Sequence, residues 1–198
     1  MLHNSEKVRS FIAIELPEDI KGSLARLRSE LEGAEHTFVK WVDAEGIHLT
    51  LKFLGNIPLK QVPEITEAIE EARQGIPCFH LGLSDLGFFP NLKQPRVFWI
   101  GIGGELDKLL RLQQNIDNAL IPFGFAKEEH TFVPHLTLAR IKQAGAPAER
   151  KKLAELAMSL KLTDEHQQMS FVVASISLMR SQLTPQGAIY THLSTIEL

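Results

Sequence analysis

The tetrapeptide His-Leu-Thr-Leu stands at residues 48–51 and again at residues 135–138. Successive side chains of a β-strand point to opposite faces, so in each copy the histidine and the threonine share one face and the two leucines share the other. Each copy therefore predicts a half-buried strand that presents an imidazole and a hydroxyl on the same side. Two such strands side by side would surround one spot with two titratable imidazoles and two hydroxyl donors. That arrangement suits in-line displacement at a phosphate.

The repeat is improbable by chance. With the composition of this chain, about a hundredth of one such tetrapeptide is expected, so two copies favour a shared function over a coincidence between ordinary amphipathic strands. The flanking residues add to the signal. KFLG at 52–55 follows the first copy, FVP at 132–134 precedes the second, and Ala139 and Arg140 follow the second.

The remaining pattern predicts alternating strands and helices. Stretches rich in branched and aromatic residues predict strands at 11–16, 47–54, 79–88, 96–102, 135–141, 171–179 and 188–196. Helical spacing and end signals predict helices at 18–31, 59–73, 105–120 and 147–160. Each motif strand precedes a helix and then a long strand, which indicates a diverged internal duplication. Because no Gly/Ser-rich or Pro-rich linker separates the halves, we expect one domain over residues 1–198, with two lobes and a cleft between them.

The paired motifs and the phrases around them resemble the 2H phosphoesterase superfamily. Within it, they resemble the RNA 2′,3′-cyclic phosphodiesterases, first named for 2′-5′ RNA ligase activity. The phrases are FIAIELP at 11–17, HLTLKFLG at 48–55, PRVFWIGI at 95–102, PHLTLAR at 134–140 and SQLTPQGAIY at 181–190. The resemblance implies an α+β, two-lobed, pseudo-twofold (LigT-like) fold. It also implies a mainly antiparallel sheet with helices in each lobe, and a central cleft lined by both motifs.

The resemblance also implies a reaction and a role for each site residue. RNA ends or nucleotides with a 2′,3′-cyclic phosphate would be hydrolysed to a 2′-phosphomonoester, and the reverse reaction would form a 2′-5′ linkage. His48 would donate a proton to the leaving 3′-oxygen and His135 would accept one from water, with Thr50, Thr137 and Arg140 binding the substrate. The residues themselves indicate a pair of acid/base groups near neutral pH, but not which histidine plays which part. No metal-ligand spacing is apparent, so we expect no metal and no other cofactor.

Three functions remain open on the sequence alone. The first is hydrolysis of cyclic phosphate at RNA ends, as part of RNA processing. The second is a phosphodiesterase for another small substrate, such as a cyclic ADP-ribose phosphate or a 2′-5′ oligoadenylate. The third is a non-catalytic module that binds nucleotides or RNA ends. The intact histidine and threonine pairs weigh against the third, since a binding module has little need for two imidazoles.

Bulk properties limit the location and the partners. The chain has 198 residues and a net charge of −3, which argues against gripping long nucleic acid but allows binding of a strand end by local cations. The cations considered are Lys52, which has the strand parity of His48 and Thr50, and three arginines: Arg96, Arg140 and Arg180. One cysteine, Cys78, excludes an internal disulfide and fits a reducing cytosol. We expect a cytoplasmic, monomeric protein without a membrane span or an obligate protein partner.

Several further side chains have an ordinary structural interpretation. Cys78 follows Ile76 and Pro77, so it is expected to be a buried thiol. His192 begins a near-copy of the motif, His-Leu-Ser, and is expected to lie away from the substrate. The other histidines lack a correctly spaced threonine and are given no role: His3, His36, His80, His130 and His166. Five aromatic residues can stack on a base, although core packing is the favoured interpretation for each: Trp41, Phe53, Phe89, Phe132 and Tyr190.

Overall fold

The computed structural model describes residues 6–31, 38–142, 147, 148, 150, 151, 155, 169–185 and 187–198. Its strands are β1 Lys7–Glu15, β2 Val39–Trp41, β3 His48–Pro58, β4 Phe79–Phe89, β5 Val97–Gly104, β6 His135–Ile141, β7 Ser170–Val173, β8 Ser175–Leu183 and β9 Ala188–Glu197. Its α-helices are α1 Glu18–Leu31, α2 Val62–Ala72 and α3 Leu106–Ala119. Short 3-10 turns lie at η1 Ala44–Gly46, η2 Leu59–Gln61 and η3 Ile121–Phe123.

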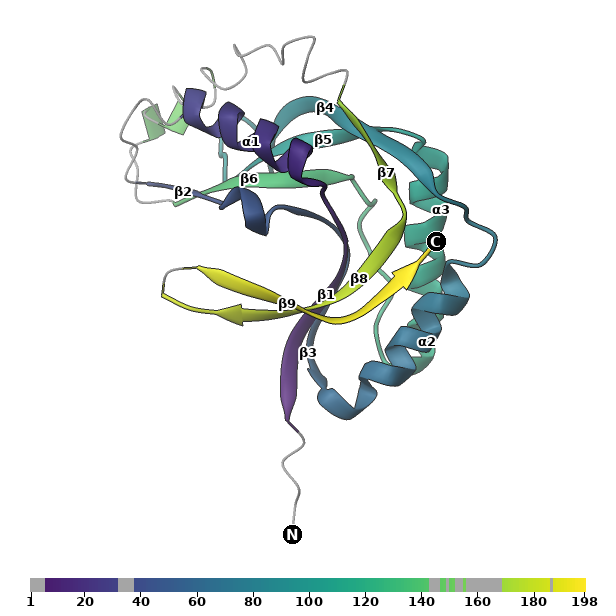
Figure 1. The fold of residues 1–198 in the computed structure, drawn as a ribbon. Helices are drawn as coiled ribbons and strands as arrows, with labels where there is room; N and C mark the ends of the chain where they lie inside the picture. The colour runs from purple at the N-terminus through teal and green to yellow at the C-terminus, as the bar shows by residue number, and fades with distance from the viewer. Residues whose placement is uncertain are drawn as a thin grey trace.

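The strands form one curled antiparallel sheet of two halves (Figure 1). The first half-sheet has the order β3-β1-β8-β9, and the second has the order β7-β4-β5-β6 with β2 paired to β6. The halves meet where β3 pairs with β6, at Leu49 and Leu136. The predicted α+β class, the mainly antiparallel sheet and the two-lobed arrangement are confirmed, and the two lobes share a continuous sheet.

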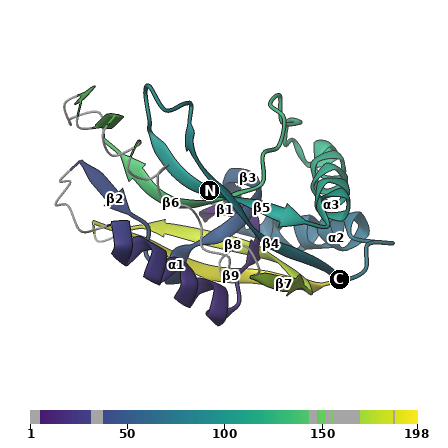
Figure 2. The ribbon, with the colours of Figure 1, turned by 90° about the horizontal axis from the view of Figure 1, so that it is seen from above.

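The helices cover the sheet with apolar faces. In α1, Ile20, Leu24, Leu27 and Leu31 recur at helical spacing and are buried in the core. On the other side of the molecule, α2 and α3 lie side by side (Figures 1 and 2). No helix within the described ranges is long and apolar enough to cross a membrane.

One predicted strand is two strands in the structure. The expected strand at 171–179 breaks at Ala174: β7 pairs with β4 in the second half-sheet, whereas β8 pairs with β1 and β9 in the first. The chain changes partners without any polar or glycine-rich interruption, so the prediction of one strand was wrong. Strand β2 was missed because it has three residues. Most of the expected helix at 147–160 lies outside the described residues.

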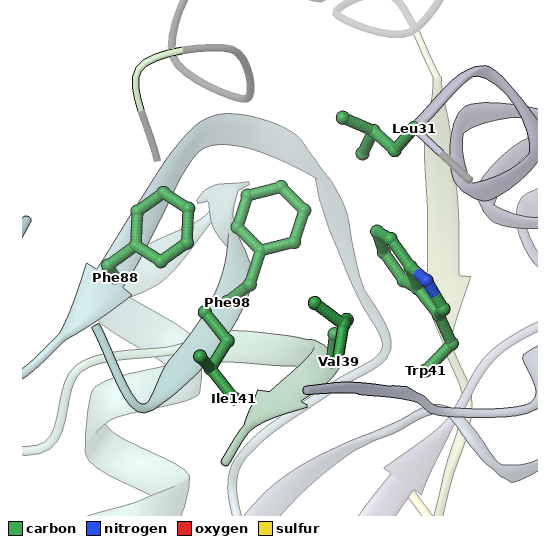
Figure 3. A pocket seen from close by; sticks show the side chains of 7 residues that line it. Leu31, Val39, Trp41, Phe88, Phe98 and Ile141 are labelled. Carbon is green, nitrogen blue, oxygen red and sulfur yellow. The ribbon is translucent and has the colours of Figure 1, made fainter. Parts of the chain in front are cut away.

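A small apolar pocket marks where α1 meets the second half-sheet. In Figure 3 the side chain of Leu31 faces Trp41, and the rings of Phe88 and Phe98 lie next to each other. These two rings stack with centroids 4.8 Å apart. The lining is entirely apolar, so we interpret this pocket as part of the core and not as a ligand site.

Candidate active site

The two motif strands bring their polar residues to one place. Leu49 of β3 pairs with Leu136 of β6 in an antiparallel register. In an antiparallel pair the neighbours run in opposite order, so His48 comes on the side of Thr137 and Thr50 on the side of His135. The leucines are buried beneath, while the histidines and threonines are half-buried and line one cleft. The sheet thus brings the four residues predicted from the tetrapeptides together, in a diagonal arrangement about the Leu49–Leu136 pair.

Both imidazoles are oriented by the same local hydrogen bond. Nδ1 of His48 lies 2.9 Å from the carbonyl oxygen of Gly46, and Nδ1 of His135 lies 2.7 Å from that of Val133. A carbonyl oxygen can only accept, so Nδ1 carries the hydrogen in each ring. Each Nε2 is therefore the nitrogen left for the cleft, as an acceptor when the ring is neutral and as a donor when it is protonated.

A β-bulge follows the threonine in both copies. In β3 the register against β1 skips Leu51, and in β6 the register against β5 skips Leu138. A bulge inserts one extra residue and reverses the facing of the residues after it. As a result two consecutive residues are buried in each strand, and the fifth residue after each histidine, Phe53 or Arg140, is exposed.

The bulge corrects the predicted place of Lys52. Strict alternation placed its ammonium with His48 and Thr50, but the structure buries it at 3% exposure, in an ion pair with Asp117. Asp117 neutralises this charge, so Lys52 is not a free cation for a phosphate. Arg140 and Lys52 are both among the residues that line the cleft, whereas Arg96 and Arg180 are not.

His48 has an aromatic and largely buried surrounding. The ring of Phe11 stacks on it with centroids 4.6 Å apart, and the ring of Tyr190 meets it edge-on at 5.0 Å. Burial lowers the pKa of His48, while the hydrogen bond to Gly46 and the negative charge of Glu15 act in the opposite direction. Glu15 lies directly across from His48 in the pairing of β1 with β3.

His135 is supported differently, by rings that meet it at steep angles. Phe89 lies at 4.9 Å with an interplanar angle of 82°, and Trp99 lies at 6.1 Å and 61°. The indole of Trp99 covers Gly87 so closely that a Cβ there would lie 2.2 Å from it. Glycine at residue 87 therefore leaves the space that the Trp99 indole occupies beside His135.

Sequence reasoning undervalued several residues of the cleft. All five aromatic residues considered for stacking line it, and Phe53 is 64% exposed, which contradicts core packing for that ring. Of the cations, Arg9 and Lys40 line the cleft and are exposed, and His130 lines it too. No sequence signal marked these three, because their approach depends on the curl of the sheet and on the course of the loop before β6.

Other sequence predictions concern residues outside the cleft. His192 is not among the lining residues; its Nε2 lies 2.7 Å from Oε2 of Glu15, and the hydroxyl of Ser177 donates to the same oxygen at 2.9 Å. Burial raises the pKa of Glu15, but these two hydrogen bonds act against burial and hold the pKa below its usual value. Cys78 is exposed, so its expected burial was wrong. Among the described residues no three His, Cys, Asp or Glu side chains gather in a metal-binding group.

Comparison with known proteins gives this arrangement a family. The family model described as LigT like Phosphoesterase matches residues 14–99 and 101–190. The chain belongs to the LigT-like phosphoesterase family. The resemblance inferred from the paired motifs is thereby confirmed.

Curated relatives of this LigT-like chain cover almost its whole length. A protein of Methanothermobacter thermautotrophicus named RNA 2′,3′-cyclic phosphodiesterase is 34% identical over 192 residues, which are 97% of this chain and 100% of that protein. A protein of Aeropyrum pernix with the same name is 37% identical over 178 residues, or 89% of this chain and 95% of that protein.

Solved structures of LigT-like proteins match the fold. A Thermus thermophilus protein superposes with a TM-score of 0.77 at 26% identity, covering 96% of this chain and 97% of its own. Escherichia coli LigT complexed with 3′-AMP also gives 0.77, at 25% identity, covering 98% of this chain and 99% of its own. The predicted LigT-like fold class is confirmed.

Proposed function

We propose that this protein hydrolyses the 2′,3′-cyclic phosphate at RNA ends to a 2′-phosphomonoester. The observation that carries the proposal is the cleft in which two H-x-T strands meet, with both Nδ1 atoms held by backbone carbonyls. Membership of a phosphoesterase family, and relatives named RNA 2′,3′-cyclic phosphodiesterase, support an enzyme over a non-catalytic binding module.

The proposed chemistry is a single in-line displacement. Water attacks phosphorus as Nε2 of His135 takes its proton, and the bond from phosphorus to the 3′-oxygen breaks as Nε2–H of His48 protonates that oxygen. The phosphate stays on the 2′-oxygen. The proton gained by His135 and the proton lost by His48 exchange with solvent before the next turnover.

The surroundings of His48 affect how readily it gives up a proton. Burial beneath Phe11 lowers the pKa of His48, and an imidazolium with a lowered pKa gives up its proton more readily to a leaving alkoxide. The bound phosphate brings a negative charge into the cleft, which favours the protonated ring before reaction. The division of roles still comes from the family resemblance, and a substrate with a good leaving group tests it.

The other cleft residues bind the substrate and stabilise the transition state. The hydroxyls of Thr50 and Thr137 are suited to donate to the non-bridging oxygens, where charge builds in the transition state. The Arg140 guanidinium can take two phosphate oxygens at once. The exposed ring of Phe53, beside Phe11 at 6.1 Å, offers a face on which the terminal base stacks.

A product analysis tests the proposal. An oligonucleotide with a 2′,3′-cyclic phosphate is incubated with the protein in excess EDTA, and the product is treated with a 3′-specific phosphatase. We expect turnover without added metal and a product that resists the phosphatase. Loss of activity in EDTA that Mg²⁺ or Mn²⁺ restores would contradict the metal-free mechanism, and a 3′-phosphate product would reverse the roles of the histidines.

The same assay separates the related functions. A mononucleotide cyclic phosphate is compared with the oligonucleotide end, and preference for the latter supports an RNA terminus as the substrate. Adding an RNA with a 5′-hydroxyl tests the reverse reaction, in which a 2′-5′ linkage forms. We further propose that residues 1–198 work as one catalytic domain. Its monomeric state and cytoplasmic location stay predictions.

A further inference from the structure

Two buried charged side chains near the cleft, Lys52 and Asp117, are paired with each other. Lys52 follows the first motif on β3, and Asp117 lies in the last turn of α3. Their side chains form an ion pair in which only 2% and 4% of each is exposed. Neither charge has a part in the chemistry proposed above, so the reason for burying them must be sought in their other contacts.

Each partner of the ion pair also binds the segment at 125–134. Nζ of Lys52 donates to the carbonyl oxygen of Ala126 at 2.9 Å. The other carboxylate oxygen of Asp117, Oδ2, accepts from the backbone amide of Glu128 at 3.1 Å. Ammonium and carboxylate thus hold the beginning of this segment from two sides, with charge-assisted hydrogen bonds.

The segment at 125–134 shapes the cleft and leads into the second motif. It contains no helix or strand, and its residues Glu128, His130, Thr131 and Phe132 line the cleft. At its far end the carbonyl oxygen of Val133 accepts the Nδ1–H of His135. The orientation of that imidazole therefore depends on where the segment lies.

Stability alone does not explain a buried lysine–aspartate pair. A buried ion pair loses hydration on both partners, and apolar side chains of similar size often stabilise a protein equally well or better. Helix α3 is already fixed to the core by Leu109, Leu112 and Ile116, all buried. What apolar side chains cannot do is bind the carbonyl of Ala126 and the amide of Glu128.

We infer that Lys52 and Asp117 are positioning residues, which tie the strand of the first histidine to the segment that orients the second. Through Ala126 and Glu128 they fix the segment in the wall of the cleft, and through Val133 the segment orients His135. This inference rests on the proposed function for its effect on turnover, but the contacts themselves can be tested without any substrate.

The first test is amide hydrogen exchange on the unmodified protein. If the ion pair holds the segment, the Glu128 amide exchanges as slowly as buried amides of α3, although it lies outside any helix or strand. Exchange of Glu128 as fast as that of an exposed loop would overturn the inference. This measurement is independent of whether any variant folds.

The second test removes the pair without leaving a lone buried charge. Lys52→Met with Asp117→Leu replaces both partners by apolar side chains, and Leu112→Ala in α3 serves as a control for stability, away from the segment. For the double variant we expect cooperative unfolding, faster exchange at Glu128, a changed His135 imidazole resonance in NMR, and a fall in kcat of about tenfold to a hundredfold. Leu112→Ala should keep kcat within about twofold of the unmodified protein.

The outcomes separate this inference from the proposed function. An unmodified protein that does not hydrolyse the cyclic phosphate contradicts the proposed function, while the exchange and His135 measurements still decide the inference. A folded double variant with unchanged kcat and an unchanged His135 resonance overturns the inference. A fall in kcat in Leu112→Ala as large as in the double variant also overturns it, because general destabilisation would then be the cause.

Discussion

The two motif strands, β3 and β6, have the same backbone design but different surroundings. Each orients its histidine through the carbonyl two residues earlier, and each bulges at the second leucine of the motif. The fifth residue after the histidine is exposed in both, but it is an aromatic ring, Phe53, in one and a cation, Arg140, in the other. His48 is stacked beneath Phe11, whereas His135 is met by ring edges.

The two motif strands therefore share a backbone geometry and differ in the side chains placed on it. A symmetric site with two identical halves would treat both sides of the phosphorus alike, but a cyclic phosphate has a nucleoside on one side only. We infer that the β3 half binds the nucleobase and protonates the leaving 3′-oxygen. The β6 half then binds the charged phosphate and activates the water. Substitution of equivalent residues in the two halves tests this division.

His48→Ala and His135→Ala are expected to cause the largest losses. Each removes one side of a concerted proton transfer, and general acid–base catalysis contributes about 10²–10⁴-fold. Because both groups act in one step, the double variant should be little worse than either single variant. Single-turnover rates on the cyclic phosphate measure this, and losses that multiply in the double variant would mean that the two histidines act in separate steps.

A substrate with a good leaving group separates the two histidines. On a phosphodiester that releases nitrophenolate, no acid is needed, so His48→Ala should regain much of its lost rate. His135→Ala should not, since water still lacks a base. The opposite pattern would exchange the roles and leave the two-histidine site intact.

Arg140→Ala is expected to lower kcat/KM by about 10²–10³-fold, since it removes a charged donor from the transition state. Arg140→Lys is the matched control: it keeps the charge and loses the bidentate geometry, so it should recover only part of the rate. Steady-state kinetics of both variants measure the loss. An alanine variant as active as the unmodified protein would remove Arg140 from the site.

The sequence was sufficient to predict which residues share a face wherever the regular alternation of a strand decides it. Alternation alone placed His48 with Thr50 and His135 with Thr137, and the repeat indicated that the two pairs meet. The same alternation failed at Lys52, because a bulge shifts the facing by one residue and leaves no composition signal. It failed for Phe53 for the same reason, since the ring was expected in the core.

Other features depend on contacts between segments that are distant in the chain. The division of the strand expected at 171–179 between two half-sheets follows from partners on β4 and β1, which local pattern does not contain. The place of Arg9 and Lys40 in the cleft follows from the curl of the sheet. The partner of Lys52 is a helix residue far along the chain, and only packing reveals it.

Thr50→Ala and Thr137→Ala should lower kcat by about tenfold to a hundredfold each, less than the histidine variants. Each removes one neutral donor to a transition-state oxygen, while the other hydroxyl and Arg140 stay in place. Serine in either position is the control and should retain most of the rate, because it keeps the hydroxyl. Losses equal to those of the histidine variants would indicate that the threonines hold the imidazoles instead.

Phe53→Ala should act mainly on binding, with KM raised about tenfold and kcat nearly unchanged. Stacking of a base on an aromatic ring is worth about 1–3 kcal/mol and does not involve the reacting atoms. Phe53→Leu keeps apolar area without an aromatic face, so its KM should lie between those of the unmodified protein and Phe53→Ala. A variant that lost kcat without a change in KM would place Phe53 in the chemistry and contradict the proposed division between the halves.

Substitutions of Glu15 and His192 should shift the pKa of His48, and with it the pH dependence of activity, by a small amount and in opposite directions. The charge of Glu15 raises the pKa of His48 against the lowering effect of burial, and His192 is the partner of Glu15 at 2.7 Å. Since His48 must be protonated to act as the acid, activity falls as pH rises through its pKa, and a lowered pKa places that alkaline limb at lower pH.

Glu15→Gln should lower the pKa of His48 and move this alkaline limb to still lower pH. His192→Asn leaves the Glu15 charge less compensated and should move the alkaline limb to higher pH. Titration of the imidazole resonances by NMR measures both shifts at His48, with His135 as the internal reference, and shifts of the same sign in both variants would contradict the electrostatic account.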